Sequence, residues 1–108
     1  MYKFTPADRV LEIALEQKRR GADIAKIVTG AADMEQQIEN LRITNMLKKE
    51  LGIPFLFLSS GVSEEIHRRL GMHLGNCMQL CVYEHDAFST FPQPLLTVSK
   101  TIRDDLGF

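Results

Sequence analysis

One lysine interrupts an apolar run near the start of the chain. Lys26 follows Ile24-Ala25 and precedes Ile27-Val28, a short β-branched run typical of a strand buried on both faces of a parallel sheet. Burial there disfavours the charged ammonium and lowers the pKa of the lysine, and a neutral amine attacks carbonyl carbon to form a Schiff base. The alternative is that Lys26 lies at a strand edge and extends its ammonium into water.

Four soft ligands recur at intervals of four residues: His73, Cys77, Cys81 and His85. On one helix they would share a face and could hold a metal ion. Gly75-Asn76 interrupts such a helix. If residues 77–83 form a strand instead, the two cysteines are about 13 Å apart, too far for one zinc ion. We therefore predict no metal site and ordinary packing roles for the cysteines.

Two neighbouring arginines could bind a carboxylate. Arg68 and Arg69 follow Glu64 and Glu65 by four positions, so each pair can form a surface ion pair on a helix. The functional alternative turns one guanidinium toward the carboxyl ends of the strands, where it would bind a substrate carboxylate in bidentate fashion.

The composition limits the class of protein. The 108 residues carry 13 Lys+Arg against 14 Asp+Glu, which leaves no basic excess for a nucleic-acid partner. No apolar window resembles a membrane span or signal peptide, and two cysteines make no disulfide framework. Glycine-rich phosphate loops, nucleophile elbows and dinucleotide fingerprints are absent from the sequence. We expect a cytoplasmic chain with a single domain over residues 1–108, no membrane contact and no cofactor.

Hydrophobic periodicity predicts the elements that would position these residues. Helical spacing covers about residues 7–20, 33–51, 63–74 and 95–106, and apolar strands cover residues 24–28, 55–58 and 78–82. The order is α-β-α-β-α-β-α, which indicates a three-stranded parallel sheet in an α/β fold. Three strands cannot close a barrel. The chain therefore forms a small open sandwich or exposes an apolar sheet face that a partner must cover.

Several segments resemble the type I 3-dehydroquinate dehydratases, shikimate-pathway lyases. Residues 20–28, Arg-Gly-Ala-Asp-Ile-Ala-Lys-Ile-Val, are similar to the segment that carries the family's Schiff-base lysine. Residues 4–6, 54–60 and 66–71 resemble further family segments, the last of them the I-S-R-L-x-G helix. The resemblance implies that Lys26 forms the imine, that Arg68 binds the carboxylate of 3-dehydroquinate, and that no metal or organic cofactor takes part.

The resemblance also implies a partial fold, the C-terminal half of a TIM-type (β/α)8 barrel. The place of the family's catalytic histidine falls just before Met1, so we expect weak activity from this chain alone. The family's substrate-closing loop, S-x-P-G-Q, corresponds to residues 87–94, where Ser89 and Gln93 are the candidate substrate-binding residues. We expect a homo-oligomer or a complementary half-barrel chain to complete the barrel.

Two other functions remain open on the sequence. The chain could be a non-catalytic half-barrel module that self-associates or binds a partner through its exposed sheet face. It could also be a class I aldolase-like lyase that uses Lys26 on another carbonyl substrate. Carbonyl trapping by a Lys26→Met variant would distinguish an enzyme from a binding module.

Overall fold

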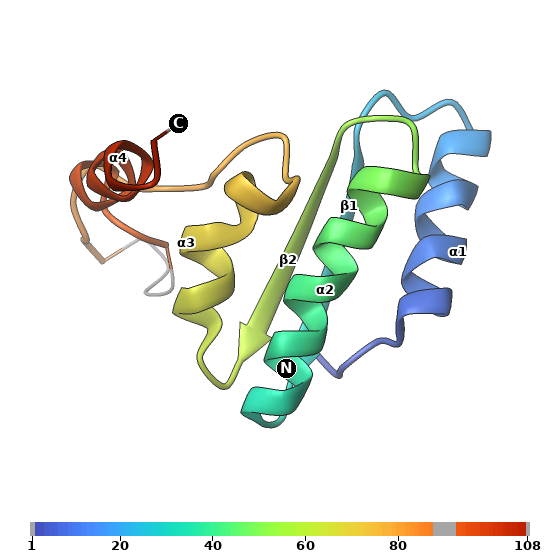
Figure 1. Ribbon diagram of the computed structural model, residues 1–108, viewed down its shortest axis with the longest axis horizontal. Coiled ribbons are helices and arrows are strands. Elements are labelled where there is room, and N and C mark those ends of the chain that lie inside the picture. The colour runs from blue at the N-terminus through green and yellow to red at the C-terminus, as the bar shows by residue number, and fades with distance from the viewer. Residues whose placement is uncertain (1, 88–92, 108) are drawn as a thin grey trace.

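The computed structural model describes residues 2–87 and 93–107 and contains a two-stranded parallel sheet flanked by helices (Figure 1). The elements in chain order are α1 (Ala7–Arg19), β1 (Ala25–Ala31), α2 (Met34–Glu50), β2 (Phe55–Gly61), α3 (Glu64–Leu74) and α4 (Leu96–Asp105). The four expected helices and the first two strands are confirmed. Within the described residues, no helix has both the length and the apolar character needed to cross a membrane.

The first two strands are longer than the apolar runs that predicted them. They pair in parallel from Ala25 opposite Phe55 to Ala31 opposite Gly61. Both strands thus include the small polar residues that follow each apolar run. The backbone continues to pair there because the loops at this end of the sheet are also joined, with the Val62 N–H donating to the Ala31 carbonyl (3.0 Å).

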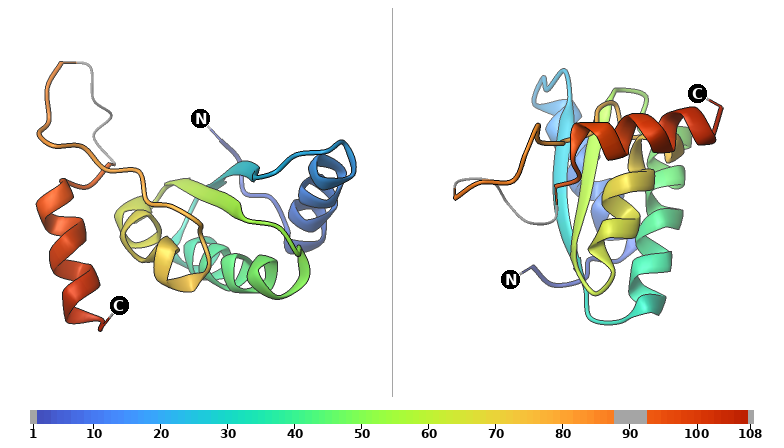
Figure 2. Two further views of the ribbon diagram at one scale, coloured as in Figure 1. Left: turned by 90° about the horizontal axis from the view of Figure 1, so that it is seen from above. Right: turned by 90° about the vertical axis from the view of Figure 1, so that its left-hand side faces the viewer.

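All three helices packed on the sheet lie on one of its faces (Figure 2). Alternate strand residues, such as Ile27 and Phe57, face α1 and α2 and form the core with helix residues that are almost fully buried: Val10, Ala14, Ile43, Leu47 and Leu51. Because side chains alternate along a strand, Lys26 and Val28 face the other way. Among the described residues, the helices that pack on the sheet thus lie on one face. We call the other face, which carries Lys26 and also the buried side chains of Leu56 and Leu58, the open face.

The expected third strand at residues 78–82 does not form. The side-chain amide of Asn76 occupies the outer edge of β2, accepting from the Phe57 N–H (2.7 Å) and donating to the Phe57 carbonyl (3.0 Å). The Cys77 N–H donates to the Phe55 carbonyl (2.8 Å), and the chain then leaves the sheet. The three-stranded prediction is therefore wrong, because a side chain takes the backbone positions that a third strand would need.

Residues 78–82 pack instead toward the last helix. Val82 makes a single parallel bridge with Leu95 at the start of α4. The Gln79 side-chain amide donates to the Ser99 hydroxyl (3.0 Å) within α4. Figure 1 shows α4 beyond α3, away from the two strands.

A group of buried polar side chains lies between α2, the strands and α3, beside the apolar core. Its members are each fully buried: Gln37, Asn40, Thr44, Ser59 and His67. Asn40 donates to the Gly30 carbonyl (3.1 Å) and the Ser59 hydroxyl (3.0 Å), and Gln37 donates to the Val62 carbonyl (2.7 Å). We call these five residues the polar layer; they connect α2 to both strands.

Candidate active site

Lys26 is the second residue of β1 and lies on the open face. Its side chain is exposed, whereas the neighbouring Leu56, its partner across the sheet, is 5% exposed. The burial expected from the sequence is therefore wrong for Lys26, although its partner Leu56 on the same face is buried. The side chain makes no ion pair with any described residue, which leaves the amine free of a carboxylate partner.

The backbone of Lys26 is held by a side chain from α1. The Gln17 amide accepts a hydrogen bond from the Lys26 N–H (2.9 Å) and donates one to the Lys26 carbonyl (3.0 Å). Sequence reasoning missed this contact, since it joins two elements through one half-buried helix residue. The spacing of nine residues across a helix–strand connection gives no signal for such a pair.

Arg68 lies in the second turn of α3, which follows the carboxyl end of β2. The expected surface pairs with acidic residues four positions earlier do not form. Glu64 instead accepts from the Gly61 N–H (3.2 Å) and closes the loop after β2. Arg68 is half-buried, and its Nε has no hydrogen-bond partner in the described part of the chain. Its guanidinium is therefore not neutralised by a neighbouring carboxylate.

His67 precedes Arg68 but belongs to the polar layer. The Thr44 hydroxyl donates to the Asn40 carbonyl (2.9 Å), so it accepts from His67 Nε2 at 3.0 Å. The imidazole meets Phe57 edge-on, with ring centroids 5.6 Å apart. Burial, aided by the positive charge of Arg68 and opposed by a hydrogen bond to the Asn40 backbone, lowers the pKa of His67 to about 4.

The position of His67 excludes it as a proton carrier for Lys26. Phe57 faces the helices, as the core packing shows, and Lys26 points to the opposite face of the same sheet. His67 is thus separated from the lysine by the strands.

Gln93, the described one of the two loop residues expected to bind substrate, is not joined to Lys26 or Arg68. Gln93 is half-buried just ahead of α4, and Ser89 lies outside the described residues. No hydrogen bond or ion pair connects any two of Lys26, Arg68 and Gln93. Their assignment to one site stays a prediction.

A hollow of about 390 Å³ lies at the carboxyl ends of the strands. It is lined by Tyr2, Lys3, Phe4, Ala31, Ala32, Gln36 and Gly61. The N-terminal segment forms one wall, because the Gly30 N–H donates to the Lys3 carbonyl (3.1 Å) and a Cβ at Gly30 would clash with the Tyr2 carbonyl. Ligands of parallel α/β proteins bind at this end of the sheet. Apart from the glycines at the strand ends, no sequence pattern predicts this hollow.

The soft ligands do not come together. Cys77 is exposed and Cys81 is half-buried, and both thiols are free. Within residues 2–87 and 93–107, no group of three or more histidine, cysteine or acidic side chains is placed to hold a metal ion.

Comparison with known proteins assigns the chain to a family. The family model described as type I 3-dehydroquinase matches residues 2–99, nearly the whole sequence. The chain belongs to the type I 3-dehydroquinase family. Among curated proteins no match was found.

Solved structures of dehydroquinases have the same fold as this chain. The 3-dehydroquinate dehydratase of Geobacillus kaustophilus superposes with a TM-score of 0.84 at 24% sequence identity over 96% of this chain. The type I enzyme of Clostridium difficile, solved with covalently modified comenic acid, gives 0.82 at 18% identity over the same share. This chain covers 40% and 41% of those two proteins. The fold is therefore part of a dehydroquinase barrel, with two strands in its sheet rather than three.

Proposed function

We propose that this dehydroquinase-family chain carries the Schiff-base half of a 3-dehydroquinate dehydratase site, with Lys26 as the nucleophile. The observation that carries the proposal is the placement of Lys26 on the open face of β1 without an ion-pair partner. Its amine attacks the substrate ketone, and water leaves as the imine forms. The imine accepts the electron pair released when a base takes a proton from the adjacent carbon. The resulting enamine expels the β-hydroxyl, which takes up that proton and leaves as water. Hydrolysis of the product imine restores the lysine.

Arg68 is proposed to bind the substrate carboxylate. A guanidinium matches a carboxylate with two parallel hydrogen bonds, and that of Arg68 is not paired with Glu64. Its position after the carboxyl end of β2 agrees with ligand binding at that end of a parallel sheet. Ser89 and Gln93 are proposed as further contacts with the same substrate.

The imine step can be tested apart from turnover. Imine formation needs the lysine and the substrate ketone, but it does not need the later removal of a proton from carbon. The chain is incubated with 3-dehydroquinate and borohydride, which reduces an imine to a stable amine, and is then analysed by intact mass and peptide mapping. We expect one substrate-derived adduct on Lys26, and none in Lys26→Met. The matched control is Lys49→Met, an exposed lysine on α2, which should leave the adduct unchanged.

Absence of an adduct in a folded wild-type chain would contradict the proposal. An adduct that persists in Lys26→Met would also contradict it, because the reactive amine would then be another lysine. An adduct with other ketones but not with 3-dehydroquinate would favour an aldolase-like lyase.

A second candidate is a non-catalytic module that binds a partner through the open face. The observation in its favour is that all three packed helices lie on the other face of the sheet. Self-association or binding of a complementary half-barrel chain would cover the open face. Light scattering over a range of concentrations tests self-association, and a mass that stays at 12.3 kDa would contradict it.

A further inference from the structure

The Lys26 peptide groups point away from β2. In a parallel pair, alternate residues direct their N–H and C=O groups toward the neighbouring strand. Ala25 does so, since its N–H donates to the Pro54 carbonyl (3.1 Å). Gly30, an even number of residues from Lys26, instead donates to the Lys3 carbonyl on the outer edge of β1. The backbone groups of Lys26 lie on this outer edge, and Gln17 is their partner.

Gln17 makes both of the hydrogen bonds that a neighbouring strand would make to Lys26. Its amide oxygen and nitrogen bind the N–H and C=O of that single residue at 2.9 and 3.0 Å. Asn76 binds Phe57 in the same way on the outer edge of β2. Each outer edge of the sheet is therefore held at one residue by a side-chain amide, and on β1 that residue is the candidate nucleophile.

From this geometry we propose that Gln17 is a positioning residue for the Lys26 amine, an inference that rests on the proposed Schiff-base function. The direction of the Lys26 Cα–Cβ bond follows from its backbone orientation. Strand β2 makes its hydrogen bonds to the residues that flank Lys26. On the outer edge, the Lys26 N–H and C=O are held by the Gln17 amide. A fixed backbone restricts the positions that the amine can occupy, so a larger share of them lies within reach of the substrate carbonyl.

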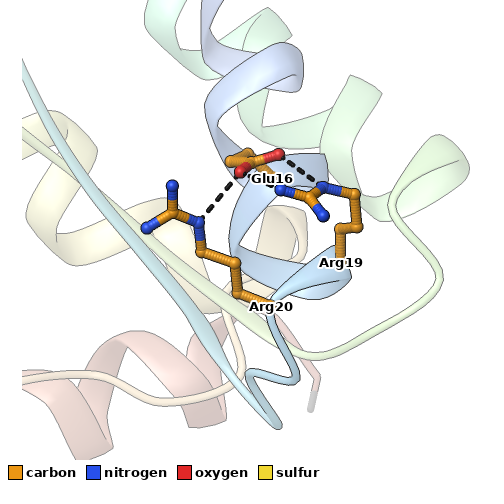
Figure 3. A network of polar contacts seen from close by, with 3 residues as sticks. All are labelled: Glu16, Arg19 and Arg20. Carbon is orange, nitrogen blue, oxygen red and sulfur yellow. Dashed lines mark hydrogen bonds and ion pairs between the residues drawn. The ribbon is translucent and has the colours of Figure 1, made fainter.

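The turn that carries Gln17 supports an amide in this position. The adjacent Glu16 carboxylate is bound by Arg19 (2.8 Å) and by Arg20 (2.9 Å), as Figure 3 shows. These two contacts, that of Arg19 first, lower the pKa of Glu16 and keep its charge engaged on α1. At the end of α1, the neutral Gln17 amide contacts the Lys26 backbone, while the neighbouring Glu16 carboxylate is bound by the two arginines. The Lys26 amine makes no ion pair with any described residue.

The test compares Gln17→Met with Gln79→Met. Methionine preserves side-chain volume and helix propensity but removes the amide. Gln79 is the matched control, because its half-buried amide also makes a hydrogen bond, to the Ser99 hydroxyl (3.0 Å), but that partner lies in α4, away from the two strands. Two quantities are measured: the exchange rate of the Lys26 amide hydrogen by NMR, and the rate of reductive trapping with 3-dehydroquinate and cyanoborohydride.

In Gln17→Met we expect the Lys26 amide to exchange faster by on the order of tenfold, the effect of losing one or two hydrogen bonds. The trapping rate should fall about three- to tenfold in a chain that stays folded at the assay temperature, while Gln79→Met leaves both rates at wild-type values. A wild-type trapping rate in Gln17→Met, or an equal fall in both variants, would overturn the positioning role.

Failure of the proposed function gives a different result. No adduct in any of the three proteins would overturn both the Schiff-base function and the positioning role. Faster amide exchange confined to Gln17→Met would still be seen in that case, since it reports the hydrogen bonds alone.

Discussion

Acid should destabilise the fold through His67. Burial and the Arg68 charge lower the pKa of this histidine from 6.5 to about 4, so the folded state keeps it neutral where the unfolded chain binds a proton. The contribution of the neutral His67 to the free energy of unfolding is fully present above pH 6.5 and is lost as the pH decreases toward 4. With 1.36 kcal/mol for each pKa unit, the shift corresponds to a loss of about 3 kcal/mol in the free energy of unfolding. That is a large share of the stability of a small domain.

Urea denaturation at several pH values between 7.5 and 4 measures this loss. His67→Gln is the informative variant, because its amide can still donate to the Thr44 hydroxyl but does not titrate in this range. Its free energy of unfolding should decline less steeply with acid than that of the wild type, by up to about 1.4 kcal/mol per pH unit. The same substitution at the exposed His85 serves as control. Parallel pH profiles for wild type and His67→Gln would refute the assignment of a buried, neutral imidazole.

Three further substitutions test the packing described above. Gly30→Ala places a Cβ against the Tyr2 carbonyl and should lower the free energy of unfolding by about 1–3 kcal/mol; an unchanged urea midpoint would contradict this close approach. Asn76→Leu leaves the buried N–H and C=O of Phe57 unpaired and should cost about 2–4 kcal/mol, again measured in urea. Glu16→Gln removes only exposed ion pairs, so its thermal midpoint should stay at the wild-type value in both low and high salt.

The repeating elements could be predicted because their signals are local. Helical spacing and the stop at Gly21, where φ is +94°, define α1, and the Asp33 side chain caps α2 by accepting from the Gln36 N–H (2.8 Å). The start of α1 shows how such a signal can mislead. Thr5 has the residue type of a helix cap, but Pro6 occupies the cap position and the Thr5 N–H donates to the Thr29 hydroxyl instead (3.0 Å).

The third strand could not be excluded from the sequence because the competing contact is not local. Alternation at residues 78–82 is a strand pattern, yet strand formation needs a free edge on β2. Asn76 closes that edge by contacting Phe57, 19 residues earlier. A tertiary hydrogen bond of this kind has no periodicity to reveal it.

The residues of the candidate site could be identified from the sequence, but their surroundings could not. Lys26 and Arg68 were singled out by residue type and spacing, and their roles came from the resemblance to a family to which the comparison then assigned the chain. The surroundings of both residues were not predictable. The exposure of Lys26 depends on tertiary packing, since its strand partner Leu56 points to the same face and is buried. The absence of an Arg68–Glu64 pair depends on the loop that Glu64 closes.

The polar layer has a consequence for how the chain finds its alignment during folding. Apolar contacts alone would tolerate α2 sliding along the sheet, since one Leu or Ile replaces another with little loss. A slip of one helical turn, about 5.4 Å, would separate Asn40 from both Gly30 and Ser59 and leave their buried groups unpaired. Each such group costs about 1–3 kcal/mol. We expect the polar layer to raise the free energy of compact states in which α2 is shifted along the sheet. It contributes little to the net stability of the correctly aligned state.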